Sequence, residues 1–159
     1  MEYTVRRAAL ADADTLVGFT VAEAAESEGA AKPAATIRAG IVAALADETV
    51  ATYWVLDAGS QAIGNISVVK EWSDWHAGYY WWIQSMYLLP SHRGRGLMRL
   101  LLQAVEQAAR DQAALELRLY VHQDNARAIQ AYRKAGFNDS AYRIMTLGLG
   151  RGEGHGAGE

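Results

Sequence analysis

One segment near the middle of the chain limits its fold more than any other. An apolar run stops at Pro90, and a glycine-rich basic loop then leads into a helical pattern. Gly94 and Gly96 allow the backbone to approach an anion, and the first turn of the next helix has unpaired N–H groups that favour negative charge. Three arginines add positive charge: Arg93, Arg95 and Arg99. The segment predicts a phosphate-binding turn between a strand and a helix, with a solvated basic turn as the alternative.

The spacing of these glycines excludes two common phosphate loops. The dinucleotide fingerprint needs a third glycine as in G-x-G-x-x-G, and the ATP-binding loop needs G-x-x-x-x-G-K-[ST]. Arg99 stands where the third glycine would fall. The loop alone therefore does not identify a ligand, and a second segment, residues 125–137, has to be considered with it.

With both segments in view, the chain resembles the GNAT superfamily of acetyl-CoA-dependent N-acetyltransferases. The acyl-CoA loop of that family reads [QR]-x-x-G-x-[GA]; Arg93 and Gly96 match it, and Met98 departs from it at the third position. The later family motif, N-x-x-A-x-x-x-Y-x-x-x-G-F, is matched at every fixed position: Asn125, Ala128, Tyr132, Gly136 and Phe137. The order of elements also agrees, so the resemblance covers nearly the whole chain. Residues 75–78 and 81–87 are similar to a bacterial branch of the superfamily whose acceptors are poorly defined.

Composition is typical of one globular domain. The chain has 159 residues, of which 51% are hydrophobic and 21% charged, and a net charge of −3 gives no support to a general nucleic-acid role. It contains no cysteine, which excludes disulfides, a thiolate zinc cluster and a cysteine acyl-enzyme. The N-terminal residues lack the apolar core of a signal peptide, and no run is long enough to span a bilayer. We therefore expect a cytoplasmic protein without a metal site.

Hydrophobic patterning predicts an α/β (α+β) fold. Strands are expected over residues 3–7, 50–56, 63–69, 79–89, 115–121 and 142–149. Helices are expected to begin at the capping residues Asp12 and Thr36, after the glycine loop, and at Asn125. The resemblance implies a mostly antiparallel sheet flanked by helices, in which strands 79–89 and 115–121 form a splayed parallel pair that holds the pantetheine arm. We expect one domain over residues 1–149 and a glycine-rich, disordered tail over residues 150–159.

The resemblance implies an acetyl-CoA (CoA) site built mainly from backbone groups. Those that bind the pyrophosphate belong to Arg93, Gly94, Arg95, Gly96, Leu97 and Met98. Met86 and Leu88 lie where the family uses backbone groups to pair with pantetheine and to polarise the thioester carbonyl. Asn125 is expected to cap a helix, to contact the pantetheine arm, or both.

On the acceptor side, the resemblance places Trp82 and Gln84 where relatives often carry a Glu or His base. Neither residue takes a proton near neutral pH, so the base is a water chain, a carboxylate or an imidazole from elsewhere. The segment expected to form the acceptor side carries three glutamates: Glu23, Glu26 and Glu28. We predict that Glu26 contacts the acceptor amine or its water, against the alternative of a solvated acidic face. His76 and Asp74 are weaker candidates.

Tyr132 is the strongest single catalytic candidate. It follows Asn125 by seven residues, about two helical turns, so both residues face the same side of a helix. In the family, the tyrosine at this position hydrogen-bonds the thioester sulfur and protonates the departing thiolate. A packed tyrosine with a satisfied hydroxyl is the alternative.

Together these features predict an N-acetyltransferase that moves an acetyl group from acetyl-CoA directly to a primary amine of a small molecule or peptide. The missing strand base leaves a non-catalytic acyl-CoA-binding or regulatory domain as one alternative. The basic loop leaves a nucleic-acid-binding module as another, although we expect no nucleic-acid or membrane partner. The acceptor, the acyl chain length and the oligomeric state stay open; homodimers are common in the family, but no residue decides the matter here.

Overall fold

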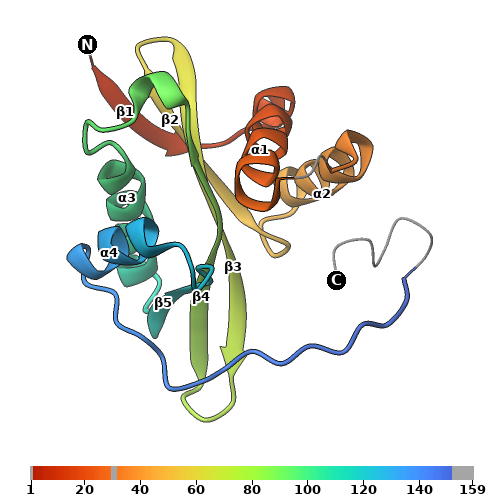
Figure 1. The fold of residues 1–159 in the computed structure, drawn as a ribbon, viewed down its shortest axis with the longest axis vertical. Helices are drawn as coiled ribbons and strands as arrows, with labels where there is room; N and C mark the ends of the chain where they lie inside the picture. The colour runs from red at the N-terminus through yellow and green to blue at the C-terminus, as the bar shows by residue number, and fades with distance from the viewer. Residues whose placement is uncertain (1, 30–31, 152–159) are drawn as a thin grey trace. The chain divides into compact units, whose positions relative to one another are not determined.

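The computed structural model describes residues 2–29 and 32–151 (Figure 1). Contacts divide the chain into two compact units, Met1–Tyr120 and Val121–Glu159, which we describe separately. The elements of the first unit are β1 (Tyr3–Arg7), η1 (Leu10–Asp12), α1 (Ala13–Glu28), α2 (Ala34–Ala46), β2 (Thr52–Ala58), β3 (Gln61–Ser73), β4 (Gly78–Leu88), η2 (Pro90–His92), α3 (Met98–Asp111) and β5 (Glu116–Leu119). Among the described residues, no helix is long and apolar enough to cross a membrane.

The first unit is built on a five-stranded sheet of order β1-β2-β3-β4-β5. The first three pairs of neighbours are antiparallel, and β4 pairs with β5 in parallel. A parallel pair needs a crossover connection, which α3 supplies. The predicted fold class, a mostly antiparallel mixed sheet with one parallel pair, is confirmed.

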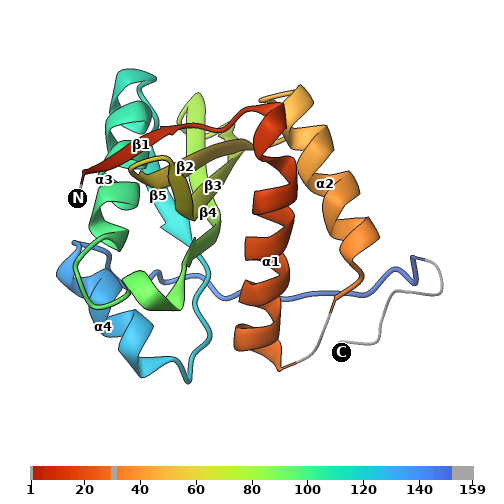
Figure 2. The same cartoon turned by 90° about the horizontal axis from the view of Figure 1, so that it is seen from above.

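Helices cover both faces of this sheet: α1 and α2 lie on one face and α3 on the other (Figure 2). Toward α1 and α2, a buried cluster joins helix and sheet side chains: Leu16, Val17, Phe19, Ile41, Val55 and Tyr87. The Phe19 and Tyr87 rings lie 5.5 Å apart, which fixes α1 against β4. α3 buries Leu101, Val105 and Ala109 at the three- and four-residue spacing of an amphipathic helix.

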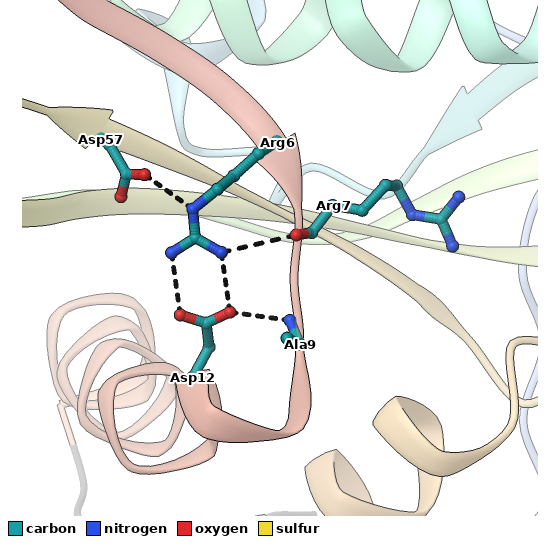
Figure 3. Close-up of polar contacts among 5 residues, drawn as sticks. All are labelled: Arg6, Arg7, Ala9, Asp12 and Asp57. Carbon is teal, nitrogen blue, oxygen red and sulfur yellow. Dashed lines mark hydrogen bonds and ion pairs between the residues drawn. The ribbon is translucent and has the colours of Figure 1, made fainter. Parts of the chain in front are cut away.

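The start of α1 is attached to the sheet by Arg6 (Figure 3). Its guanidinium donates to both carboxylate oxygens of Asp12 at 2.9 Å and to Asp57 at 2.6 Å. Asp12 also accepts the Ala9 N–H at 2.7 Å. The hydrogen bonds from Arg6 are the main reason that the pKa of Asp12 lies below its ordinary value. Asp12 does occupy the N-cap position of α1, but its side chain makes no capping hydrogen bond to that helix, contrary to the prediction.

The predicted start of the second helix also differs. α2 begins at Ala34 with Pro33 as its N-cap, so Thr36 lies inside the first turn. Pro fixes φ near the value that a helix start needs, which favours this earlier start.

A β-bulge divides β4 into two parts. Ser67 pairs with Ser85 and Val68 pairs with Ile83, so Gln84 is the extra residue on β4. β5 pairs with β4 only over residues 80–83. Beyond Ile83 the edge of β4 that faces β5 is therefore open, as expected for a splayed pair.

The second unit contains α4 (Ala126–Lys134), and the Asn125 side chain caps it by accepting the Ala128 N–H at 3.1 Å. The strand predicted over residues 142–149 is absent: these residues carry no strand assignment. Five large apolar side chains of this segment are exposed: Tyr142, Ile144, Met145, Leu147 and Leu149. A strand requires a hydrogen-bonded neighbour, and no described residue supplies one. The predicted tail falls largely on residues 152–159, outside the described residues, and the single-domain boundary at residue 149 stays a prediction.

Candidate functional site

The glycine loop between η2 and α3 has the backbone that its sequence predicts. Gly94 and Gly96 have φ values of +80° and +73°, in the left-handed region that favours glycine. A Cβ at either position would meet nothing within 4 Å, so the loop is open around both glycines. Among the described residues, no hydrogen bond uses the backbone N–H groups of residues 94–98. The loop therefore offers a set of free donors at the start of α3, which suits an anion.

The side chains of Arg93 and Arg95, near the loop, are engaged in contacts within the protein. Arg93 donates from Nε to the Leu88 carbonyl at 2.9 Å and pairs with Glu26 at 2.9 Å. Arg95 donates to the Tyr3 hydroxyl at 3.3 Å. Arg93 thus connects the end of β4 to α1. Its side chain is occupied there, and the anion donors of the loop are backbone groups.

The open edge of β4 carries the two residues that were predicted to act through backbone groups. The Met86 N–H donates to Oε2 of Glu23 at 3.2 Å, and the Leu88 carbonyl accepts from Arg93. A side chain from another element therefore contacts the backbone at both residues. The structure brings Met86, Leu88, Arg93 and Glu26 together and adds Glu23, while the roles assigned to these residues stay predictions.

The two α1 carboxylates at this site have opposite electrostatics. Burial raises the pKa of Glu23; the Met86 N–H acts against this rise, and the charge of Glu26 adds to it. The pKa of Glu26 is lowered, mainly by its hydrogen bond from Arg93. Glu26 is exposed and held in an ion pair, whereas Glu23 is half-buried against the sheet. The third glutamate of this run, Glu28, has a side chain outside the described part of the structure.

A chain of polar side chains crosses the sheet on the face that α1 covers. Ser67 and Ser85 are buried or half-buried, and their hydroxyl oxygens are 2.6 Å apart. Asn65 donates to the Ser85 hydroxyl at 3.3 Å. Burial raises the pKa of Tyr53, with the charge of Glu23 contributing in the same direction. On α1 the buried Thr20 hydroxyl has no partner among the described residues.

The part of β4 before the bulge is lined by aromatic and charged side chains. Trp82 stacks on Tyr120 with ring centroids 4.5 Å apart, and its indole N–H donates to Glu71 at 2.7 Å. The guanidinium of Arg118 lies 3.4 Å from the centroid of the Tyr80 ring. Gln84, the bulge residue, is exposed. Trp82 is therefore fixed by its contacts, whereas Gln84 is open to solvent.

The weaker candidates lie in the turn between β3 and β4. His76 and Asp74 are both exposed, and the His76 ring packs edge-on toward Tyr80 with centroids 6.5 Å apart. No group of three or more metal-ligating side chains occurs in the described part of the chain.

In the second unit, Tyr132 lies on α4, two turns beyond the cap formed by Asn125. Its half-buried ring packs edge-on against Phe137, with centroids 5.8 Å apart. The Phe137 N–H donates to the Tyr132 carbonyl at 3.0 Å and closes the end of the helix. The roles predicted for Asn125 and Tyr132 at the thioester stay predictions.

A family model described as the acetyltransferase (GNAT) family matches residues 21–137, well over half of the chain. The protein therefore belongs to this family, and the resemblance seen in the two motifs is confirmed. The family is one of acetyltransferases. The open glycines, the free N–H groups of residues 94–98 and the open edge of β4 are compatible with the acetyl-CoA site that the resemblance implies.

Curated relatives match only part of the chain. An uncharacterized N-acetyltransferase of Mycobacterium tuberculosis (strain ATCC 25618 / H37Rv) is 38% identical over 66 residues, which are 42% of each chain. A streptothricin acetyltransferase of Streptomyces lavendulae is 42% identical over 55 residues, or 35% of this chain and 29% of the relative. The matched stretches thus span less than half of these relatives.

Solved structures match over nearly the whole chain. A possible acetyltransferase from Clostridium difficile 630 superposes with a TM-score of 0.88 and 27% identity, covering 94% of this chain and 99% of that one. An aminoglycoside N-acetyltransferase solved in complex with CoA gives a TM-score of 0.78 at 15% identity, covering 93% and 95% of the two chains. The second match shows the shared fold.

Proposed function

We propose that this protein transfers an acetyl group from acetyl-CoA directly to a primary amine of a small molecule or peptide. The observation that carries the proposal is the open edge of β4, which presents the Met86 N–H next to a half-buried carboxylate. The glycine loop with its free backbone donors follows directly along the chain. Family membership supports the reaction type, and the absence of cysteine favours direct transfer.

On the donor side, acetyl-CoA supplies the acetyl group activated as a thioester. The N–H groups of residues 94–98 bind its pyrophosphate, and Met98 joins them through its backbone as the first residue of α3. The Met86 N–H polarises the thioester carbonyl, a contribution on the order of 2.7 to 4 kcal/mol in acyl-transfer sites. Arg93 holds the Leu88 carbonyl and thereby fixes the loop relative to β4.

On the acceptor side, Trp82, Gln84 and Glu26 surround the approach of the amine. Glu26 is negatively charged and exposed, so it attracts an ammonium group even while it pairs with Arg93. Two of the relatives are named for their acceptors, streptothricin and an aminoglycoside. These names support testing both antibiotics beside polyamines, amino acids and peptides with free N-termini.

For the leaving group, Tyr132 donates a proton to the CoA thiolate, and Asn125 contacts the pantetheine arm. The family motif supports both roles, and the half-buried position of Tyr132 on α4 is compatible with them. Replacement of Tyr132 by Phe should lower kcat by about 10²- to 10⁴-fold, the usual contribution of a positioned acid. Full turnover by a Tyr132→Phe protein that still binds CoA would exclude this role.

The test of the function combines binding with turnover. Thermal unfolding of the purified protein with acetyl-CoA, CoA or ATP should show a higher midpoint for the first two only, because a ligand that binds the folded state stabilises it. Release of free thiol from acetyl-CoA is then measured with each amine. Binding without thiol release from any amine would favour the regulatory alternative. Salt-sensitive nucleic-acid binding, with an unfolding midpoint that CoA does not raise, would favour the nucleic-acid-binding alternative.

A further inference from the structure

We propose that Glu23 is the base that accepts the amine proton, and that in the donor-free protein its carboxylate holds the Met86 N–H that the thioester carbonyl later takes. This inference rests on the proposed function and adds a residue to it. The contact between the Glu23 carboxylate and the Met86 N–H, from two elements far apart in sequence, is the observation behind it.

The position of Glu23 makes this contact specific. Glu23 follows Leu16 by seven residues and Phe19 by four, so it lies on the stripe of α1 that packs against the sheet. Met86 lies beyond Ile83, on the stretch of β4 that β5 leaves open. A carboxylate at this edge is within one hydrogen bond of the amide at which the acyl carbon is expected.

The contact is also easy to replace. Its N–O distance is 3.2 Å, at the long end of the range for N–H···O hydrogen bonds. The thioester carbonyl oxygen can replace the Glu23 carboxylate as the acceptor of the Met86 N–H. This exchange leaves the carboxylate next to the reacting centre and disrupts no helix or strand.

The surroundings of Glu23 provide polar partners for the displaced carboxylate and an incoming amine. The Thr20 hydroxyl lies one turn earlier on α1 and is buried with no partner among the described residues. Buried polar groups in native proteins nearly always have a partner, so this hydroxyl is available to hydrogen-bond the Glu23 carboxylate once that group leaves the Met86 amide. The buried polar chain through Ser67 and Ser85 begins at Tyr53, and the charge of Glu23 contributes to the raised pKa of the Tyr53 hydroxyl.

The charged groups around Glu23 favour a stronger base once the donor binds. Glu26 faces it from the same helix, Tyr53 from β2 and the Met86 amide from β4, while Arg93 neutralises part of the Glu26 charge. Of these, the Met86 N–H lowers the pKa of Glu23, against the rise due to burial. Loss of that hydrogen bond removes the lowering influence, so the pKa rises further toward the range that suits a base near neutral pH.

The reaction balances with Glu23 in this role. The neutral amine nitrogen forms the new N–C bond as the C–S bond breaks, and the sulfur leaves with the electron pair. The nitrogen then carries one proton more than the amide product needs, and the Glu23 carboxylate takes it. The thiolate receives its proton from Tyr132, which regains one from water, and Glu23 returns its own proton to water before the next cycle.

The test compares Glu23→Gln and Glu23→Asp with Glu106→Gln, a matched change at an exposed glutamate of α3. With acetyl-CoA and an amine turned over by the wild type, Glu23→Gln should lower kcat by about 10²- to 10⁴-fold and lose the acid limb of the pH profile. Glu23→Asp should recover part of the rate. Acetyl-CoA should raise the unfolding midpoint of all three proteins.

A second measurement does not depend on turnover. In NMR spectra of the donor-free wild type, the Met86 amide should titrate with a midpoint above the ordinary Glu pKa. This titration should vanish in Glu23→Gln and on addition of acetyl-CoA. An unchanged kcat in Glu23→Gln, or a Met86 amide that titrates equally in that variant, would overturn the assignment. If the wild type turns over no amine, the proposed function fails, whereas the Met86 titration still decides the contact.

Discussion

The two halves of β4, divided by the bulge at Gln84, use the same strand in different ways. In the upstream half, residues 78–83, both edges are hydrogen-bonded, to β3 and to β5, and the distinctive contacts come from side chains such as Trp82. In the downstream half, residues 84–88, the edge away from β3 is met instead by Glu23 and Arg93. The difference teaches that side-chain contacts dominate one part of the strand and backbone contacts the other, with the bulge as the boundary.

The largest effect on stability should come from Gly64, which pairs with Leu88 in the downstream half. A Cβ at Gly64 would lie 2.6 Å from the Tyr87 carbonyl oxygen, so Gly64→Ala must push β3 and β4 apart. We expect a loss of about 1–3 kcal/mol in the free energy of unfolding, measured with urea. Gly18→Ala is the control, because its Cβ meets nothing within 4 Å and it should gain about 0.5–1 kcal/mol. Equal stability of the two variants would contradict the close approach.

Replacement of Arg93 by Gln should affect the downstream half alone. It removes the hydrogen bond to the Leu88 carbonyl and the pair with Glu26. We expect acetyl-CoA to bind about tenfold more weakly, or about 1.4 kcal/mol, while the partly exposed ion pair adds less than about 1 kcal/mol to stability. Isothermal titration with acetyl-CoA measures this, and Arg38→Gln, which breaks an exposed pair with Asp14, should bind as the wild type does. If Arg93→Gln changed the KM for the acceptor but left the affinity for acetyl-CoA unchanged, the assignment of Arg93 to the downstream half would be wrong.

Replacement of Trp82 by Phe tests the upstream half. The variant keeps an aromatic ring against Tyr120 but loses the indole hydrogen bond to Glu71, a net contribution of about 1 kcal/mol. Steady-state kinetics should show an acceptor KM changed by up to about fivefold at an unchanged acetyl-CoA affinity. Trp72→Phe, at an exposed position of β3, is the control. Weaker acetyl-CoA binding by Trp82→Phe would show that the halves are not separate.

The smallest effect on function should come from Asp12, remote from both halves. Because Arg6 lowers its pKa in the folded state, Asp12 contributes stability that is present above its unfolded pKa of about 3.9 and is lost as pH falls through the folded value. Thermal midpoints recorded from pH 6 down to pH 2 should therefore fall less steeply for Asp12→Asn than for the wild type. Arg6→Gln should flatten the profile in the same way, and both variants should keep wild-type acetyl transfer at pH 7. If the thermal midpoint of Asp12→Asn fell with pH as steeply as that of the wild type, the pair between Arg6 and Asp12 would not contribute to the acid dependence of stability.

Much of the fold could be predicted because its elements carry local patterns. The apolar spacing of α3 and the crossover from β4 to β5 predicted the parallel pair. The segment 142–149 has an equally good local pattern, yet it forms no strand, because strand formation depends on a neighbour that pattern does not specify. The prediction that the Asp12 side chain caps α1 was wrong for a similar reason. Arg6, which is not part of that helix, binds the Asp12 carboxylate instead.

At the site, the glycine pattern predicted the loop and the family resemblance implied Met86 and Leu88, and the structure places Arg93 and Glu26 beside them. The bulge at Gln84 could not be predicted, because one extra residue leaves no mark in a single strand pattern. Glu23 was named but not preferred. Its spacing from Leu16 and Phe19 was a usable signal for burial, whereas the attraction of Arg93 for Glu26 depends on a loop distant in sequence.

Because the contacts of the downstream half use main-chain N–H and C=O groups, point mutation there leaves the contacting groups in place. A lineage that changes Trp82, Tyr80 or Arg118 alters what approaches the strand, whereas it inherits the Met86 amide unchanged. The bulge at Gln84 thus separates a part of β4 whose contacts depend on side-chain identity from a part whose contacts depend on backbone geometry.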